Sequence, residues 1–194
     1  MTPNAEISQR EELDSTTRFI HLGLTVFGVL AWITGYFAGD YKGPVHTGFS
    51  IHIWLGIGLA FFLALRILYG IYGPKQVRFS EWVPYTWDRL LLAFQDLVTL
   101  FKLHLPDRPP HQGLSGLVQT FGLLAFSWSG LTGTLMFFFL TPGRKAGGIM
   151  HSIKEIHEVG AWLIPVFLGI HVAAVTLHAL AGNHLWKRTF FLEK

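Results

Sequence analysis

The sequence contains no cysteine and only three methionines, Met1, Met136 and Met150. The lack of cysteine excludes disulfide bonds, thiolate-held iron–sulfur clusters, covalent c-type haem attachment and thiol nucleophiles. The scarcity of methionine leaves almost no thioether ligand. Because the 194 residues include ten histidines, any metal bound by this chain must be held mainly by imidazole nitrogen.

Charged residues are also scarce, which argues against an ordinary soluble domain. Asp, Glu, Lys and Arg together make up 14% of the chain, against roughly 25% in typical soluble domains. Hydrophobic residues make up 51%. Residues 1–16 are polar and partly acidic, so we do not expect them to form a signal peptide, which needs a basic start and an apolar run.

Four long apolar segments follow the polar N-terminal residues. They lie at about 17–38, 48–72, 116–140 and 157–182. Each is long enough to cross a bilayer core, which needs about 20 helical residues. A soluble four-helix bundle would need a polar stripe on each helix, and Leu59–Leu65 has none. We therefore predict an all-α integral membrane four-helix bundle that forms a single domain over residues 1–194.

The connection between the second and third apolar segments, residues 73–115, is too long for a plain turn. It contains apolar residues at helical spacing with polar residues between them: Trp87, Leu90, Leu91, Phe94, Leu97, Val98 and Phe101. This pattern predicts an extra amphipathic helix at about 86–103. Two uses of that helix remain open, namely lying in the membrane interface and packing against a partner subunit.

The distribution of basic residues predicts the orientation of the chain. The N-terminal arm, the 73–115 connection and the C-terminal tail together carry ten Lys and Arg residues, whereas the opposite side carries four. Arg66, inside a span, completes the total of 15. Cytoplasmic flanks carry the excess of basic residues, so we expect both termini on the cytoplasmic side of a bacterial inner membrane.

Four histidines, His21, His52, His157 and His171, fall within the apolar segments. Ionisable residues at such depth are rare and usually functional, because a buried polar ring needs a partner. His157 and His171 are 14 residues apart, so they differ by about 40° around one helix and about 21 Å along it. One helix face therefore presents two imidazoles, one near each membrane surface.

The antiparallel arrangement of neighbouring spans predicts two histidine pairs. His52 opens the second span at the level of His157, on the outer side, and His21 lies nearer the level of His171, on the cytoplasmic side. Each pair comes from two different helices that face one interior. Two stacked haems need this arrangement, with an axial nitrogen on either side of each iron. We therefore predict these four histidines as metal ligands and no catalytic side chain.

Other residues near the predicted pairs are candidates for contacts with the cofactor. Gly56 lies one turn after His52, and Gly133 lies in the third span, where small residues admit a flat macrocycle; close helix packing is the alternative use. Arg66 shares the face of His52 and suits a haem propionate, or it extends to the headgroups. His178 suits a propionate, a proton relay at a quinone pocket, or no specific role.

Two interpretations without haem remain open. His46 and His151 each precede a proposed outer ligand by six residues, so with His52 and His157 they could form a zinc or copper site. A transition-metal transporter could use intramembrane histidines as successive binding sites, and it would bind zinc or copper without haem absorbance. An anchor that only binds other proteins gives no reason for four interior imidazoles.

Several segments of the chain resemble one known superfamily. The segments are Arg18-Phe-Ile-His21 continuing to Thr34-Gly-Tyr-Phe, His52-Ile-Trp-Leu-Gly56 with Arg66, His157-Glu158, and Gly169-Ile-His171. Over about residues 17–190 the chain resembles the bacterial di-haem cytochrome b superfamily, which includes prokaryotic cytochrome b561 and the b-type cytochrome subunits of nickel–iron hydrogenases. The paired histidines at a spacing of 14 are the most specific element of this resemblance.

The resemblance implies two b-type haems with bis-histidine ligation and electron transfer between a quinone pool and a redox partner. We expect a periplasmic iron–sulfur or c-type haem protein as that partner, together with the lipid bilayer, no nucleic acid, and a possible homodimer. The alternative within the same class is a stand-alone quinol oxidase that passes electrons directly to a small acceptor.

Overall fold

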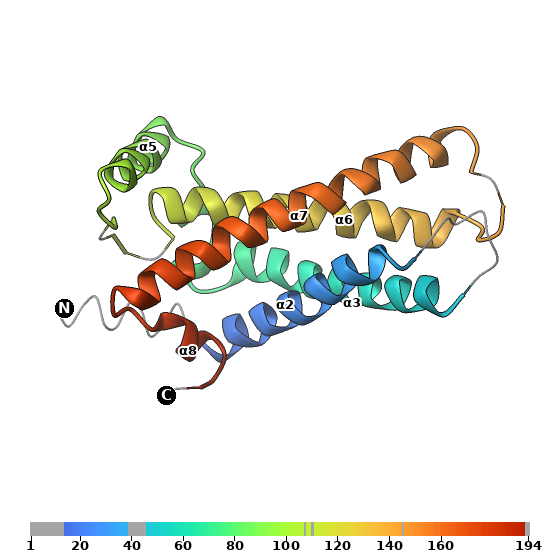
Figure 1. Ribbon diagram of the computed structural model, residues 1–194, viewed down its shortest axis with the longest axis horizontal. Helices are drawn as coiled ribbons and strands as arrows, with labels where there is room; N and C mark the ends of the chain where they lie inside the picture. The colour runs from blue at the N-terminus through green and yellow to red at the C-terminus, as the bar shows by residue number, and fades with distance from the viewer. Residues whose placement is uncertain (1–13, 39–45, 107, 110, 145, 193–194) are drawn as a thin grey trace. The chain divides into compact units, whose positions relative to one another are not determined.

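The computed structural model describes residues 14–38, 46–106, 108–109, 111–144 and 146–192. Within these ranges the chain is helical and contains no strand (Figure 1). Four helices are long and apolar enough to cross a membrane: α2 (Ser15–Gly35), α3 (Thr47–Tyr72), α6 (Leu114–Phe139) and α7 (Ile149–Leu180). The predicted fold class, an all-α membrane protein with four spans, is confirmed.

Short elements fill the connections on either side of the long helices. Between α3 and α6 lie a 3-10 turn η1 (Lys75–Val77), α4 (Phe79–Trp82) and α5 (Trp87–Phe101), and α8 (Leu185–Thr189) follows α7. The extra helix expected at about 86–103 therefore exists as α5. Thr86 precedes α5 as its N-cap residue, and its hydroxyl accepts a hydrogen bond from the backbone N–H of Arg89.

Helix α7 begins at Ile149, eight residues before the predicted start of the fourth apolar segment at 157. The first two turns carry charged residues, so hydropathy alone does not show them as part of the span. Lys154 contacts Glu158 one turn later, a pairing that stabilises a helix locally. His157 consequently lies more than two turns inside α7. Pro165 also lies within this helix.

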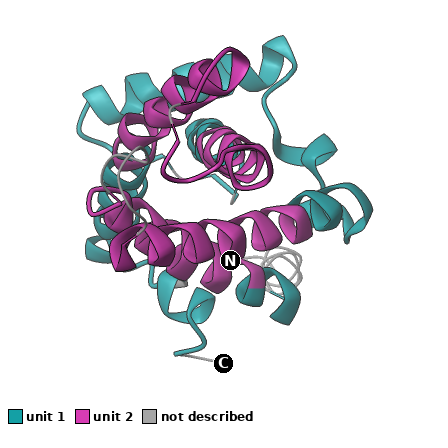
Figure 2. Cartoon of the chain, turned by 90° about the vertical axis from the view of Figure 1, so that its right-hand side faces the viewer, with its two compact units in different colours: residues 1–19, 67–123, 167–194 teal, residues 20–66, 124–166 magenta. Residues whose placement is uncertain are grey.

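The chain divides into two compact units (Figure 2). Unit 1 comprises residues 1–19, 67–123 and 167–194, and unit 2 comprises residues 20–66 and 124–166. Each of the four long helices contributes a segment to both units.

In unit 2, glycines allow the segments of the four long helices to pack closely. A Cβ atom added at any of four glycines would lie only 2.1 to 2.7 Å from a side chain of another helix. These contacts are Gly23 against Phe62, Gly28 against Phe126, Gly130 against Leu63, and Gly160 against Ser129. Membrane helices associate through such small-residue contacts because lipid provides no hydrophobic driving force between them.

In unit 1, the buried carboxylate of Asp96 ties α5 to the start of α6. Asp96 is 2% exposed. Its Oδ2 accepts a hydrogen bond of 2.9 Å from the backbone N–H of Leu114, the first residue of α6, and its Oδ1 forms an ion pair with Arg108. A Cβ at Gly113, where φ is +58°, would lie 1.9 Å from the same carboxylate, so only glycine fits there.

The apolar side of α5 is exposed rather than buried. Trp87, Phe94 and Phe101 are 77%, 61% and 80% exposed, whereas the buried side carries Ala93 and Asp96. Figure 1 shows α5 nearly end-on, crosswise to the α6 segment of the same unit. An exposed apolar stripe suits both uses expected from the sequence, the membrane interface and a partner subunit, and the choice between them remains a prediction.

Candidate metal centre

The structure brings His52 and His157 together inside unit 2. His52 lies on the second turn of α3, and His157 lies on the third turn of α7. Their ring centres are 6.2 Å apart, and the ring planes are inclined by 69°. The spacing argument that paired these two histidines from different helices therefore matches their observed positions.

The ring of His52 is oriented by a backbone carbonyl of a neighbouring helix. Its Nδ1 lies 2.9 Å from the carbonyl oxygen of Ala31 in α2. A carbonyl only accepts hydrogen bonds, so Nδ1 carries the proton and donates it. Nε2 of His52 therefore keeps its lone pair, as a metal ligand requires.

The ring of His157 is oriented in the same sense by a hydroxyl group from α6. Its Nδ1 lies 2.9 Å from Oγ1 of Thr132. That hydroxyl donates its own hydrogen to the carbonyl of Trp128 at 2.7 Å, so it accepts from Nδ1 of His157. Both rings of the pair consequently hold their proton on Nδ1 and present Nε2 as a ligand.

This pair of donors fits a haem iron better than a bare metal ion. Two imidazoles on opposite sides of one metal, with metal–nitrogen bonds of about 2.0–2.1 Å, have ring centres roughly 6–6.5 Å apart, and the observed separation is 6.2 Å. A structural zinc ion needs four protein ligands. A haem iron needs only axial ligands from the protein, because the macrocycle supplies the other four.

The glycines beside the pair differ in what surrounds them. A Cβ at Gly58 would lie 2.2 Å from the ring of Phe27, so α2 packing explains that glycine, whereas a Cβ at Gly56 would meet nothing within 4 Å. Gly56 thus leaves space on the helix face of His52 that none of the described residues fills. A Cβ at Gly133 would lie 3.1 Å from Cε1 of His157, so this ring rests on the backbone of α6.

Four membrane-length helices and an imidazole pair suited to a haem iron define the class of membrane b-type cytochromes. The family described as prokaryotic cytochrome b561 matches residues 12–191. The chain therefore belongs to the prokaryotic cytochrome b561 family, whose members bind b-type haem and transfer electrons in bacterial membranes. No curated protein and no solved structure matches the chain.

The second predicted pair is divided between the units. His21 lies in the α2 segment of unit 2, and His171 lies in the α7 segment of unit 1, so their pairing remains a prediction. Arg66 ends the α3 segment of unit 2, and His178 lies in the last turn of α7 in unit 1. The roles expected for Arg66 and His178 at a propionate or a quinone remain predictions too.

Within unit 1, the ring of His171 packs against an aromatic side chain of its own helix. The ring of Phe167, one turn earlier on α7, is stacked on the ring of His171 with centres 5.3 Å apart and planes inclined by 24°. A Cβ at Gly169 would meet nothing within 4 Å. Gly169 is exposed and lies about 200° around the helix from His171, so it belongs to the other face of α7 and not to the surroundings of that ring.

Two tryptophans that sequence reasoning also missed hold α7 on either side of His157. Trp128 of α6 donates its indole N–H to the carbonyl of Ile156 at 2.7 Å, and Trp32 of α2 donates to the carbonyl of Ala161 at 3.3 Å. Pro165 has no N–H, so it leaves the carbonyl of Ala161, four residues earlier, without its helical donor. The indole of Trp32 supplies that missing hydrogen bond.

His46 and His151 do not join His52 and His157. Nδ1 of His46 accepts a bond of 3.4 Å from the backbone N–H of Phe49 at the start of α3, and His151 is 59% exposed with its Nδ1 3.9 Å from Glu155. Among the described residues, no three His, Asp or Glu side chains are grouped closely enough to hold one metal ion. The zinc or copper alternative therefore has no four-imidazole site in this part of the chain.

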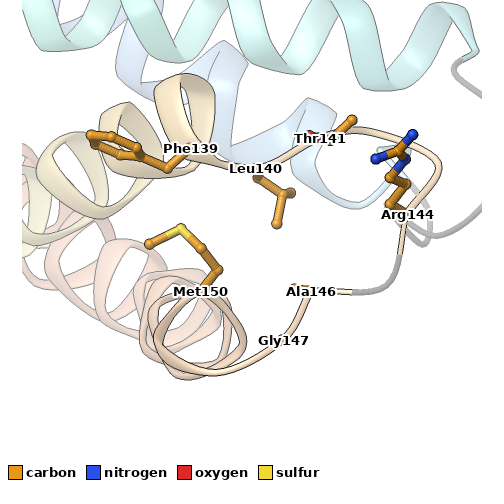
Figure 3. Close-up of a pocket in the computed structure, with 7 residues that line it drawn as sticks. All are labelled: Phe139, Leu140, Thr141, Arg144, Ala146, Gly147 and Met150. Atoms are coloured by element: carbon orange, nitrogen blue, oxygen red, sulfur yellow. The ribbon is translucent and has the colours of Figure 1, made fainter.

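A small open pocket lies at the connection between α6 and α7 in unit 2 (Figure 3). Its volume is about 260 Å³, and it is lined by Phe139, Leu140, Thr141, Arg144, Ala146, Gly147 and Met150. Typical small-molecule sites occupy roughly 300–1,000 Å³. Because the lining contains none of the predicted ligands, this pocket has no part in the metal centre.

Proposed function

We propose that this protein transfers electrons across the membrane through two b-type haems, each held by two histidines. His52 and His157 would hold one haem on the periplasmic side, and His21 and His171 would hold the other on the cytoplasmic side. The observation that carries this proposal is the His52–His157 pair, whose separation and shared tautomer suit the two axial positions of one iron.

A bound haem iron would supply the chemistry by alternating between its ferric and ferrous states. The chain would supply position and environment. The carbonyl of Ala31 and the hydroxyl of Thr132 hold Nδ1 of the two imidazoles and leave Nε2 of each available to a ligand. The apolar helices exclude water and lower the local dielectric. We expect the guanidinium of Arg66 to pair with a propionate, since Arg binds carboxylates in a bidentate manner.

The direction of the path across the membrane follows from the charge distribution. Ten basic residues on one side and four on the other favour both termini in the cytoplasm of a bacterial cell and a location in its inner membrane. The 14-residue spacing of His157 and His171 would then put one haem near each surface, about 21 Å apart along the helix. Reporter fusions at each end would test this orientation.

The electrons would pass between the membrane quinone pool and a periplasmic redox protein that carries an iron–sulfur cluster or c-type haem. We place the quinone near the cytoplasmic haem, where His178 is available as a proton relay. The rival role is a stand-alone quinol oxidase. Purified protein that oxidises quinol without a partner would favour the rival, and a requirement for the partner would favour the subunit role. A homodimer is compatible with either.

The test is the visible spectrum and haem content of protein expressed with excess haem. We expect a reduced-minus-oxidised spectrum of a b-type cytochrome and about two haems per chain. His52→Ala and His157→Ala should each remove the same single haem, whereas His151→Ala, a matched control in the same unit, should remove none. Loss of both haems in either ligand variant would contradict the pairing.

A different result would favour the transporter interpretation. Bound zinc or copper in wild-type protein, with no Soret absorbance after expression in haem-replete cells, would overturn the haem proposal. Metal analysis of the same purified sample therefore accompanies the spectrum.

A further inference from the structure

Helix α6 contains no histidine, yet three of its residues surround the α7 turn that carries His157. Thr132 bonds to the ring nitrogen Nδ1, Gly133 lets the ring rest on the α6 backbone, and Trp128 donates to the carbonyl just before His157. The helix without a ligand thus determines how the ligand on its neighbour is oriented.

Both rings of the pair have a backbone hydrogen-bond partner, and only His157 has a side-chain hydroxyl beside it. His52 donates to a backbone carbonyl, that of Ala31, which no substitution removes. His157 donates to a side-chain hydroxyl, that of Thr132, which is 8% exposed and therefore shielded from solvent that could replace it. The ring of His157 also has a hydrogen bond to the backbone of Ser129, so residue 132 supplies the part of its orientation and electron donation that a substitution can change.

We propose that Thr132 is a positioning residue of the His52–His157 haem site, which fixes the Nδ1–H tautomer of His157 and lowers the reduction potential of that haem. This inference rests on the proposed function. A hydrogen-bond acceptor on Nδ1–H makes the imidazole a stronger donor through Nε2, which stabilises ferric iron relative to ferrous iron. Removal of the acceptor should therefore raise the potential.

The test compares three variants of the haem-loaded protein in detergent. Thr132→Val keeps the shape and removes the hydroxyl, and Thr132→Ser restores a hydroxyl. Thr134→Val is the matched control: Thr134 lies two residues later on α6, and its hydroxyl donates to the carbonyl of Gly130 in the same backbone-bonding manner. The measurements are haem content and the two midpoint potentials from a spectroscopic redox titration.

In Thr132→Val we expect one of the two potentials to rise, with about a three- to tenfold larger ferrous-to-ferric ratio at fixed ambient potential, where tenfold corresponds to about 59 mV for one electron. Thr132→Ser should stay near wild type, and Thr134→Val should change neither potential. Loss of one haem in Thr132→Val, with haem retained in Thr132→Ser and Thr134→Val, would also support the proposal, because the conservative variant rescues the site.

Unchanged potentials and full haem content in Thr132→Val would overturn the role of Thr132. So would equal shifts in Thr132→Val and Thr134→Val, since these would report a general effect of losing a hydroxyl from α6. Failure of the proposed function looks different, because wild-type protein would then contain no b-type haem at all.

Discussion

The unfilled space beside Gly56 allows a sharp test of whether a macrocycle lies between α3 and α7. We predict that Gly56→Leu prevents haem binding at the His52–His157 site without destabilising the protein alone. A Cβ at Gly56 would meet no atom of the described residues within 4 Å, so there is room at this position for a side chain to begin. Replacing a helical glycine should even stabilise the apoprotein, by about 0.5–1 kcal/mol.

The expected loss of haem has a different origin from the effect on the chain. Gly56 lies one turn after His52 on nearly the same helix face, so a leucine there would project into the space that faces the ring pair. We expect at least a tenfold loss of affinity, equivalent to about 1.4 kcal/mol. The assay is haem per chain after reconstitution, together with the thermal unfolding midpoint of the haem-free protein.

Gly58→Ala is the matched control on the same helix. Its Cβ would lie 2.2 Å from the ring of Phe27, so it should destabilise the haem-free protein by about 1–3 kcal/mol through overpacking. If Gly56→Leu bound haem at both sites with wild-type affinity, the assignment of this space to the cofactor would be wrong.

Three further predictions concern interactions that support the fold. Trp32→Phe should lower the free energy of unfolding by about 1–3 kcal/mol, because the carbonyl freed by Pro165 loses its donor, and chemical denaturation in detergent measures it. Asp96→Ala should destabilise the start of α6 by a similar amount, seen as faster amide exchange at Leu114, since a buried cap and ion pair are lost. The unfolding midpoint of wild-type protein should rise as haem concentration rises, because each occupied site contributes its own binding free energy. The same increase in haem concentration should raise the midpoint of His157→Ala by a smaller amount.

Much of the fold follows from hydropathy and helical periodicity. Runs of about 20 apolar residues such as 48–72 specify spanning helices regardless of their neighbours, because an unsatisfied backbone cannot lie in lipid. The start of α7 did not follow from this argument. Its first two turns, from Ile149, carry charges that reduce hydropathy, and their helical state depends on local pairs such as Lys154 with Glu158.

The candidate site likewise has a part that the sequence predicted and a part that it did not. The histidine spacing alone indicated that His52 and His157 belong together, since antiparallel spans bring them to one level. The groups that orient the two rings, by contrast, gave no sequence signal. Every residue has a backbone carbonyl like that of Ala31. Nothing in the sequence distinguishes Thr132 from the other threonines of the spanning helices.

The absence of cysteine and the scarcity of methionine limit the types of ligand that the chain can offer a metal, and the ten histidines show where along the chain imidazole is available. Only the tertiary structure decided which nitrogen of each ring is hydrogen-bonded, which leaves Nε2 available to a ligand, and which glycine has open space around it among the described residues. The sequence does not distinguish Gly56 from Gly58. They differ because Phe27 packs against Gly58, whereas no described residue packs against Gly56. Such contacts depend on the rotation and depth of neighbouring helices, which a pattern along one chain does not contain.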